Sequence, residues 1–247
     1  MGSAMNISAY FFPEAQIDHF TFVDGTIGFY LKVKALYGEA PGPRVMDYGA
    51  GRGAWTSLDP SRTSRKTRDL RIGARETVAV DIDSAVLENV CSDKQVVIQP
   101  GQRLPFDDAS FDIIVADYVF EHIADPPATA AEMLRILKPG GWICARTANK
   151  YGYVALFSRL IPNALHRAVL HVVQPDRLEV DVFPTTYSLS TLRAVRKNFP
   201  GKRVFGTFVF AEPSYHFNRT WMYRIQLIVH KFLPRVLAPG LVVFIQK

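Results

Sequence analysis

A glycine-rich segment follows the first run of β-branched residues in the chain. It covers residues 47–53, with the sequence DYGAGRG. Glycines allow a backbone to adopt positive φ angles and to come close to a ligand. The start of the helix that would follow offers free N–H groups and a partial positive charge to a carboxylate or phosphate. The segment therefore predicts a binding site for an anionic, nucleoside-like molecule.

Two carboxylates narrow the choice of ligand. Gly49, Gly51 and Ala54 also satisfy the G-x-G-x-x-G/A pattern of dinucleotide-binding proteins. Asp47 precedes the first glycine by two residues, where a carboxylate repels a pyrophosphate and attracts an ammonium group. Asp81 follows the next predicted strand, where a carboxylate binds a ribose diol in either case. An adenosine group is therefore expected, and the choice between a nicotinamide dinucleotide and a cofactor with an ammonium group stays open.

Short β-branched runs alternate with helical patterns around these residues. Strands are predicted over residues 44–48, 77–81, 95–98, 112–116 and 142–147, and helices over residues 84–89 and 126–137. The strand runs are almost continuously hydrophobic, which is typical of strands covered on both faces. Alternating strands and helices predict a doubly wound α/β sheet, which binds ligands at the carboxyl ends of its strands.

The second part of the chain gives weaker signals. One or two helices broken at Pro162 are predicted within residues 153–173, and a helix over residues 188–198 is expected to start at Ser188 as its N-cap. A strand over residues 203–210, a basic amphipathic helix over residues 218–237 and a strand over residues 241–246 follow. Residues 56–76 have little periodicity, and we interpret them as an insertion of unassigned structure.

The composition indicates a folded protein with one sizeable core. Of the 247 residues, 48% are hydrophobic and 12% aromatic, which excludes a disordered or collagen-like chain. No uncharged apolar run reaches the ~18 residues that cross a bilayer. The first residues also lack the pattern of a secretory signal, so a cytoplasmic location is expected. Cys91 and Cys144 lie far apart, which argues against a disulfide framework or a metal site.

The positive charge is unevenly distributed. The net charge is +6, and residues 151–247 alone carry 13 Lys and Arg against 4 Asp and Glu. A second basic segment lies within residues 52–75. Such regions favour anionic partners: a phosphate-bearing molecule, nucleic acid or an anionic membrane face, which would make the protein membrane-peripheral. A solvated surface is the simpler interpretation.

Four segments together resemble the class I S-adenosylmethionine-dependent methyltransferases, in particular their small type 11 domain. They are residues 45–53, 80–83, 103–112 and 118–122 with 134–141, within a stretch from about Pro43 to Thr147. The resemblance implies a Rossmann-like α/β fold, a doubly wound sheet of seven mostly parallel strands with helices on both faces. It also implies S-adenosyl-L-methionine as cofactor and S-adenosyl-L-homocysteine as product.

The resemblance assigns cofactor-binding residues as well. They are expected to be Asp47, Gly49, Ala50, Gly51, Gly53, Asp81, Ile82, Gln102, Arg103, Leu104, Asp117 and Tyr118. The family usually holds the adenine amino group with an Asp, but residues 99–102 (QPGQ) stand at that place here. Gln102, or backbone groups near Arg103 and Leu104, are the expected substitutes.

Transfer of a methyl group to a hydroxyl requires removal of a proton. His122 is the best-placed candidate base, because an imidazole titrates near neutral pH and this one lies just past the fourth predicted strand. Asp117 and Glu121 are rival candidates. Alternatively, His122 only orients a loop and Asp117 only caps a turn.

Two regions outside the resemblance are open to two interpretations each. Residues 1–42 are predicted to form a helical lid over the cofactor, with His19 as a lining residue, or simply to pack against the sheet. Residues 43–247 would form the methyltransferase domain, with insertions at 56–76 and 151–187. In its last long helix, an apolar stripe predicts packing in the core, and contact with anionic lipid is the alternative. The stripe consists of Trp221, Ile225, Ile228, Phe232 and Val236.

The expected function is transfer of a methyl group to a hydroxyl of a small molecule, a sugar or a lipid-linked glycan, since the region after residue 150 diffusely resembles envelope-glycan methyltransferases. A non-catalytic binding protein on the same scaffold is one alternative. An NAD(P)-dependent oxidoreductase is another. Nucleic acid is a less favoured acceptor, because no Asn/Asp-Pro-Pro-Tyr/Phe motif follows the fourth strand. The oligomeric state stays open.

Overall fold

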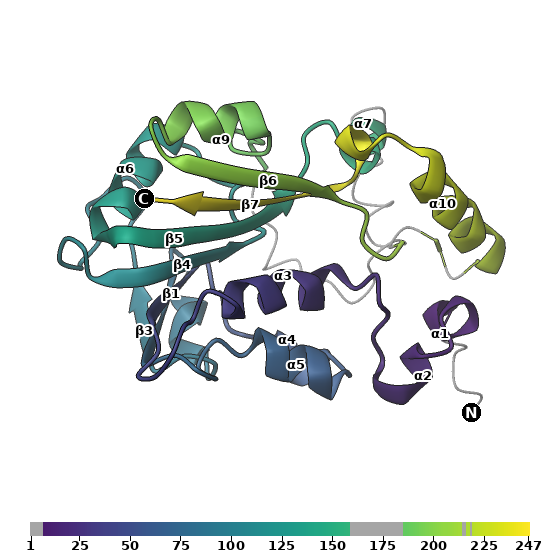
Figure 1. Cartoon of the computed structure of the whole chain (residues 1–247), viewed down its shortest axis with the longest axis horizontal. Coiled ribbons are helices and arrows are strands. Elements are labelled where there is room, and N and C mark those ends of the chain that lie inside the picture. Colours follow the sequence, from purple (N-terminus) through teal and green to yellow (C-terminus); the bar gives the residue numbers. More distant parts are fainter. Residues whose placement is uncertain (1–6, 159–184, 214–215, 218) are drawn as a thin grey trace.

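A seven-stranded sheet runs through the structure (Figure 1). This computed structural model describes residues 7–158, 185–213, 216–217 and 219–247. The strands stand in the order β3-β2-β1-β4-β5-β7-β6, and only β7 runs antiparallel to its neighbours. Their bounds are β1 Arg44–Tyr48, β2 Glu76–Asp81, β3 Lys94–Val97, β4 Phe111–Asp117, β5 Leu137–Ala148, β6 Arg203–Val209 and β7 Gly240–Gln246. The expected doubly wound, mostly parallel α/β sheet is confirmed.

Helices cover both faces of this sheet, as Figure 1 shows. On one face, α6 (Pro126–Ile136) and α9 (Leu192–Asn198) pack their apolar side chains on the strands. On the other face, α3 (Gly25–Lys34) buries Phe29, Tyr30 and Val33 against residues of β1, β4 and β5. The part of the N-terminal segment that contains α3 therefore belongs to the core.

The remaining helices are short, apart from α10. They are α1 (Ile7–Phe11), α2 (Ala15–Asp18), α4 (Trp55–Leu58), α5 (Arg62–Arg68), α7 (Tyr153–Ser158), α10 (Thr220–Phe232) and the 3-10 helices η1 (Ser84–Glu88) and η3 (Arg235–Leu237). Residues 56–76, left unassigned above, contain most of α4 and all of α5. None of the helices in the described ranges is long and apolar enough to span a bilayer. Of the helices predicted within residues 153–173, the part beyond Ser158 lies outside the described residues.

Several predicted boundaries were wrong for local reasons. The helix expected from Ser188 begins at Leu192, because the Thr191 hydroxyl caps it by accepting from the Ala194 amide, at 3.1 Å. Ser188 instead donates its hydroxyl to the carbonyl of Ile123. The helix expected over residues 218–237 ends at Phe232, since Pro234 cannot continue it.

The expected core position of the apolar stripe on α10 was also wrong. The exposed fractions of Trp221, Ile225, Ile228 and Phe232 are 61%, 51%, 51% and 77%, and Val236 beyond the helix is exposed too. The face of α10 that packs inward is centred on Tyr223, which is completely buried. Periodicity correctly predicted an amphipathic helix but not which of its faces the protein covers.

A buried ion pair joins the ends of β4 and β5 to α3. Arg146 holds both carboxylate oxygens of Asp117, with Nε–Oδ1 and Nη2–Oδ2 distances of 2.6 and 2.7 Å. From α3, the Tyr30 hydroxyl donates to the same carboxylate at 3.1 Å, and the Thr26 hydroxyl accepts from Arg146 Nη1 at 2.9 Å. Only 9% of the Arg146 side chain and 7% of the Asp117 side chain are exposed. The pair therefore fixes the strand ends and α3 relative to one another.

Replacing Arg146 should test this role. Arg146→Met leaves the Asp117 carboxylate buried without its cation, so we expect the free energy of unfolding to fall by about 3–5 kcal/mol. Urea denaturation measures the loss. Lys138→Met is the matched control, because it breaks the more exposed pair with Asp112 (2.7 Å) and should cost at most about 1 kcal/mol. Equal losses in the two variants would contradict the assignment.

Candidate functional site

A large cavity opens at the carboxyl ends of the parallel strands. Its volume is about 1220 Å³, above the ~300–1,000 Å³ typical of ligand pockets, so two reactants can share it. Its lining includes the glycine-rich segment after β1, the end of β2, the residues after β3 and the loop after β4. Most of the predicted cofactor residues lie on this lining: Gly49, Ala50, Gly51, Gly53, Asp81, Ile82, Gln102, Leu104 and Tyr118.

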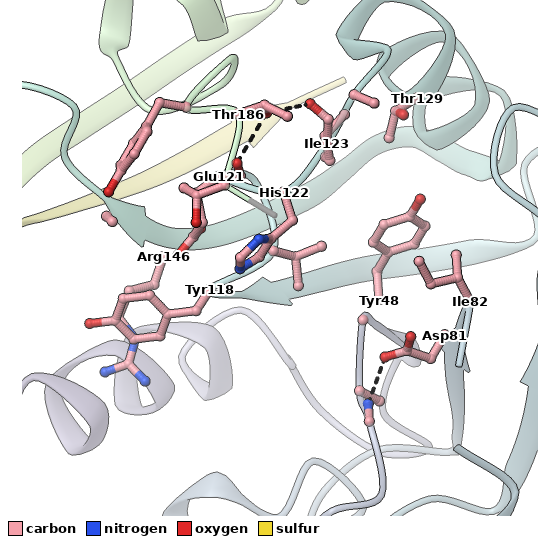
Figure 2. A pocket seen from close by; sticks show the side chains of 18 of the residues that line it. Tyr48, Asp81, Ile82, Tyr118, Glu121, His122, Ile123, Thr129, Arg146 and Thr186 are labelled. Atoms are coloured by element: carbon pink, nitrogen blue, oxygen red, sulfur yellow. Dashed lines mark hydrogen bonds between the residues drawn. The ribbon is translucent and has the colours of Figure 1, made fainter. Parts of the chain in front are cut away.

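The end of β2 holds the glycine-rich loop in place. The amide of Gly49 donates to the carbonyl of Val80 at 2.7 Å. The amide of Gly51 donates to Asp81 Oδ2 at 2.8 Å (Figure 2). Asn89 completes the support, because its side-chain amide donates to the carbonyl of Gly51 at 2.9 Å. Asn89 is buried, and no sequence pattern had singled it out.

Two glycines of this loop adopt positive φ angles, which glycine allows and most other residues disfavour. Gly49 has a φ of +74°, and a Cβ there would lie 2.4 Å from the side chain of Val119. Gly51 has a φ of +53°, yet its Cβ position has no protein atom within 4 Å. The loop is thus pressed against the residues after β4 at one point and open at another. An open backbone beside a carboxylate fits close approach of an adenosine-type cofactor.

Asp81 keeps hydrogen-bonding capacity for a ligand. Its Oδ2 accepts from Gly51, and its Oδ1 accepts from the amide of Asp83 at 3.0 Å. Each carboxylate oxygen has two lone pairs, so both can accept a further hydroxyl donor. In Figure 2, Asp81, Ile82 and Tyr48 lie on one side of the cavity, and Tyr118, Glu121 and Arg146 on the other.

Asp47 lies beneath this loop, at the end region of β1, and does not line the cavity itself. Desolvation raises the pKa of its carboxyl to about 7, against the attraction of Arg68 and with further repulsion from the carboxylates of Asp117 and Asp81. A cationic ligand nearby would favour the ionised form. The predicted attraction for an ammonium group therefore remains consistent with its position.

The adenine side of the cavity differs from the expectation in its details. Gln99, Gln102 and Leu104 line it. The amide of Leu104 already donates to Glu132 Oε2 (3.0 Å), and its carbonyl accepts from Arg135 (3.0 Å), so these backbone groups have partners within the protein. Glu132 also lines the cavity, although no motif had indicated it.

Arg103 was predicted to bind the cofactor, and the structure does not bring it to the cavity. It borders a separate small hollow with Arg44 and Phe106. Its guanidinium forms an exposed ion pair with Asp108 at 3.2 Å. An Arg next to a binding loop can either contact a ligand or form an ion pair on the protein surface, and the sequence could not distinguish the two roles.

Of the three candidate bases, two meet at the wall formed by the residues after β4. His122 and Glu121 both line the cavity, whereas Asp117 does not and is held by Arg146. Glu121 is only 5% exposed, and its carboxylate accepts from the Thr147 hydroxyl at 2.6 Å. Burial raises the pKa of Glu121, while that hydrogen bond opposes the shift. A proton can therefore be accepted on this wall.

Tyr118 begins the turn that carries these two residues. Its φ is +56°, a left-handed conformation that is uncommon for a tyrosine. Its amide donates to the carbonyl of Arg146 at 2.7 Å, and the Arg146 guanidinium lies 4.7 Å from its ring centre. In the view of Figure 2, the His122 ring lies between Tyr118 and Tyr48. The buried ion pair thus sets the direction in which the loop leaves the sheet.

A distant segment braces the same loop. The Thr186 hydroxyl donates to the carbonyls of Glu121 and Ile123, at 3.1 and 2.9 Å (Figure 2). Thr185, Thr186 and Tyr187 line the cavity as well. The predicted insertion 151–187 therefore contributes to the site at its end, while residues 159–184 lie outside the described part of the chain.

Two cations of the basic segment 52–75, Arg52 and Arg68, line the cavity. Arg68 lines it, 5.0 Å above the ring centre of Trp55 and 3.8 Å from Asp117 Oδ2. Arg65 instead donates to the carbonyl of Asp59 and, like Lys66, does not border the cavity. His19 is not among the lining residues either, whereas Gly25 is. The lid role of residues 1–42 stays a prediction.

Comparisons with known proteins agree with this geometry. The family model described as a methyltransferase domain matches residues 46–145 of this chain. A ubiquinone biosynthesis O-methyltransferase from Bordetella avium is 25% identical over 67% of the chain and 70% of its own length. A ubiquinone/menaquinone biosynthesis C-methyltransferase from Idiomarina loihiensis is 32% identical over 40% of each chain. The crystal structure of a SAM-dependent methyltransferase from Archaeoglobus fulgidus shares the fold, with a TM-score of 0.53 at 17% identity, over 96% of this chain and 99% of that one.

The raised pKa of Asp47 gives a prediction for the protein without cofactor. The folded state keeps the Asp47 proton up to about pH 7, whereas the unfolded chain loses it near its usual value of 3.8. Ionised Asp47 therefore destabilises the fold increasingly from pH 4 to pH 7 and fully above it. Asp47→Asn should raise the free energy of unfolding by about 2–4 kcal/mol at pH 8, and by much less at pH 4.5.

Urea denaturation at the two pH values measures this difference. Asp83→Asn is a suitable control, because Asp83 caps η1 and its substitution should not give a stabilisation that grows with pH. Destabilisation by Asp47→Asn at pH 8 would contradict the assigned pKa.

Proposed function

We propose that this chain is a class I S-adenosylmethionine-dependent methyltransferase and that it transfers the cofactor's methyl group to a hydroxyl of a small, mainly apolar acceptor. The observation that carries this proposal is the position of His122 and Glu121 on one wall of the cavity, with the glycine-rich loop and Asp81 on another. The acceptor would lie between these walls.

The residues present fit the cofactor. When bound, S-adenosylmethionine supplies an electrophilic methyl group on a sulfonium. Asp81 would accept hydrogen bonds from the ribose hydroxyls, the open backbone at Gly51 would allow close approach, and Asp47 would attract the ammonium group. Gln102, with Glu132 beside it on the lining, would face the adenine end.

The chain's own chemical task is then to prepare the acceptor. His122 would take the proton from the acceptor hydroxyl, so that the oxygen attacks as a stronger nucleophile. Glu121 would orient His122 and stabilise its protonated form, while Thr147 holds the Glu121 carboxylate in place. The wall formed by Thr185–Tyr187 would help to exclude water from this reaction.

The relatives favour a quinone-type acceptor over a glycan. Two curated relatives are named for ubiquinone or menaquinone biosynthesis, one as an O-methyltransferase and one as a C-methyltransferase. An O-acceptor is proposed here because a candidate base adjoins the site. The glycan acceptor and the phosphate-bearing acceptor stay predictions from sequence, and the latter has Arg52 and Arg68 of the basic segment 52–75 at the cavity.

Cofactor binding is tested first with Asp81→Ala. Loss of the charged acceptor should weaken binding of S-adenosylhomocysteine by roughly 10- to 100-fold, the equivalent of ~1.5–3 kcal/mol for a hydrogen bond to a charged group. Isothermal titration calorimetry measures it, with Asp83→Ala as the matched control that keeps the affinity. Binding of NADH in place of S-adenosylhomocysteine would overturn the proposal in favour of an oxidoreductase.

Catalysis is tested with His122→Gln. We expect kcat to fall by roughly 10²–10⁴-fold with unchanged affinity for S-adenosylhomocysteine, because only proton removal is lost. The assay follows transfer of a labelled methyl group to a short-chain catechol analogue of a quinone precursor, with a nucleotide sugar in parallel. Preference for the sugar would redirect the acceptor class. Transfer to neither, with tight cofactor binding, would favour a binding role without catalysis.

A further inference from the structure

Helix α10 turns a row of large apolar side chains to the solvent. Trp221, Ile225, Ile228 and Phe232 lie on one side of it at helical spacing, and each is more than half exposed. Single exposed apolar residues are ordinary on a protein surface, but a continuous row of this size marks an interaction site. We call these four residues the outer stripe.

The opposite side of α10 is fixed to the protein, so the outer stripe cannot turn inward. Tyr223 is completely buried, stacks on Phe11 with ring centres 4.9 Å apart, and donates its hydroxyl to Glu212 at 3.0 Å. His230, two turns further on, bonds the Tyr153 hydroxyl at 2.8 Å. The orientation of the helix is therefore determined by its inner contacts.

The charged side chains on α10 and just beyond its two ends are all basic. Arg224 and Lys231 are exposed and flank it along the helix, while Arg219 and Arg235 stand beyond its two ends. From residue 213 to the end of the printed sequence there is no Asp or Glu. An apolar face bordered by Arg and Lys is the pattern of a helix that lies in the interface of an anionic membrane.

Further apolar residues lie at the same end of the molecule. Figure 1 shows α1 and α2 below α10, and Phe11 of α1 contacts Tyr223 of α10. Tyr10, Ile17 and Phe22 from this region are 58%, 85% and 79% exposed. This end of the molecule therefore exposes large apolar side chains from two separate segments of the chain.

We propose that the outer stripe and its flanking cations dock on the surface of a bilayer that contains anionic lipid, with α10 parallel to the membrane plane. A symmetric contact with a second copy is disfavoured, because it would bring the same cations together without a carboxylate between them. An anionic headgroup layer complements these cations, and the acyl region accommodates the apolar side chains.

Docking in this orientation would place the cavity next to the membrane. His230 on the inner side of α10 lines the cavity, so a single helix separates the cavity from the docking face. If the acceptor is an apolar quinone-type molecule, which rests on the proposed function, it could pass to the cavity from the bilayer. The docking itself does not depend on that acceptor.

Vesicle co-sedimentation of the full chain tests the proposal. Vesicles of phosphatidylcholine with about one-third phosphatidylglycerol should bind the protein at least about tenfold more tightly than pure phosphatidylcholine, and added salt should weaken this binding. The double variants W221S/F232S and R224S/K231S should each reduce binding by at least about tenfold. Matched controls are L58S/L87S and R196S/K197S, which remove exposed residues of the same kinds elsewhere and should bind normally.

Two further measurements make the result unambiguous. Brominated lipid should quench the fluorescence of Trp221 and lose most of this effect in Trp221→Phe, which locates the contact. Unchanged affinity for S-adenosylhomocysteine in each variant shows that it is folded and separates failure of docking from failure of the proposed function.

Three outcomes would overturn the proposal. They are absence of vesicle binding, equal loss in the control variants, and concentration-dependent dimerisation in light scattering that the W221S/F232S variant abolishes. The last would identify the outer stripe as an interface between copies of this chain.

Discussion

The buried pair of Asp117 and Arg146 is the interaction on which the site depends most. Two charges withdrawn from water are stable only when each is fully paired, and here both carboxylate oxygens and three guanidinium nitrogens have partners. The pair joins two parallel strands at their carboxyl ends and ties α3 to both. Tyr118 leaves the sheet directly from this point in a left-handed conformation. The positions of Glu121 and His122 therefore depend on this salt bridge, although its carboxylate, Asp117, does not line the cavity.

On the cofactor side, one strand end likewise has two roles. The strand end that supplies Asp81 also supports the loop that must stay open, because one carboxylate oxygen accepts the amide of Gly51. Asn89 secures the loop from below. The cost appears at Asp47, whose pKa is raised by desolvation and by its neighbouring carboxylates. Such unfavourable electrostatics is typical of a site that is completed by a ligand, here one with a cationic group.

Helix α10, which follows β6, packs against the protein with one face and exposes the other. Its inner residues, Tyr223 and His230, connect it to the N-terminal segment and to the cavity wall, while its outer stripe remains apolar and bordered by cations. The basic character of the second half of the chain, which first suggested a phosphate-bearing acceptor, is thus concentrated in part on a surface away from the cavity. Charge alone could not distinguish an anionic substrate from an anionic surface, because both attract the same residues.

The sequence by itself determined the alternation of strands and helices, the glycine-rich loop and the carboxylate at the end of β2, because these depend on local periodicity and on backbone angles that few residues allow. It also placed His122 and Glu121 correctly near the site. Only the tertiary structure decided that Asp117 is paired with Arg146, that Arg103 serves the surface, that Thr186 braces the loop after β4 and that the stripe of α10 faces outward. These outcomes depend on contacts between residues far apart in the chain. A periodic pattern shows that a helix has an apolar side, but only the packed fold determines whether anything covers it.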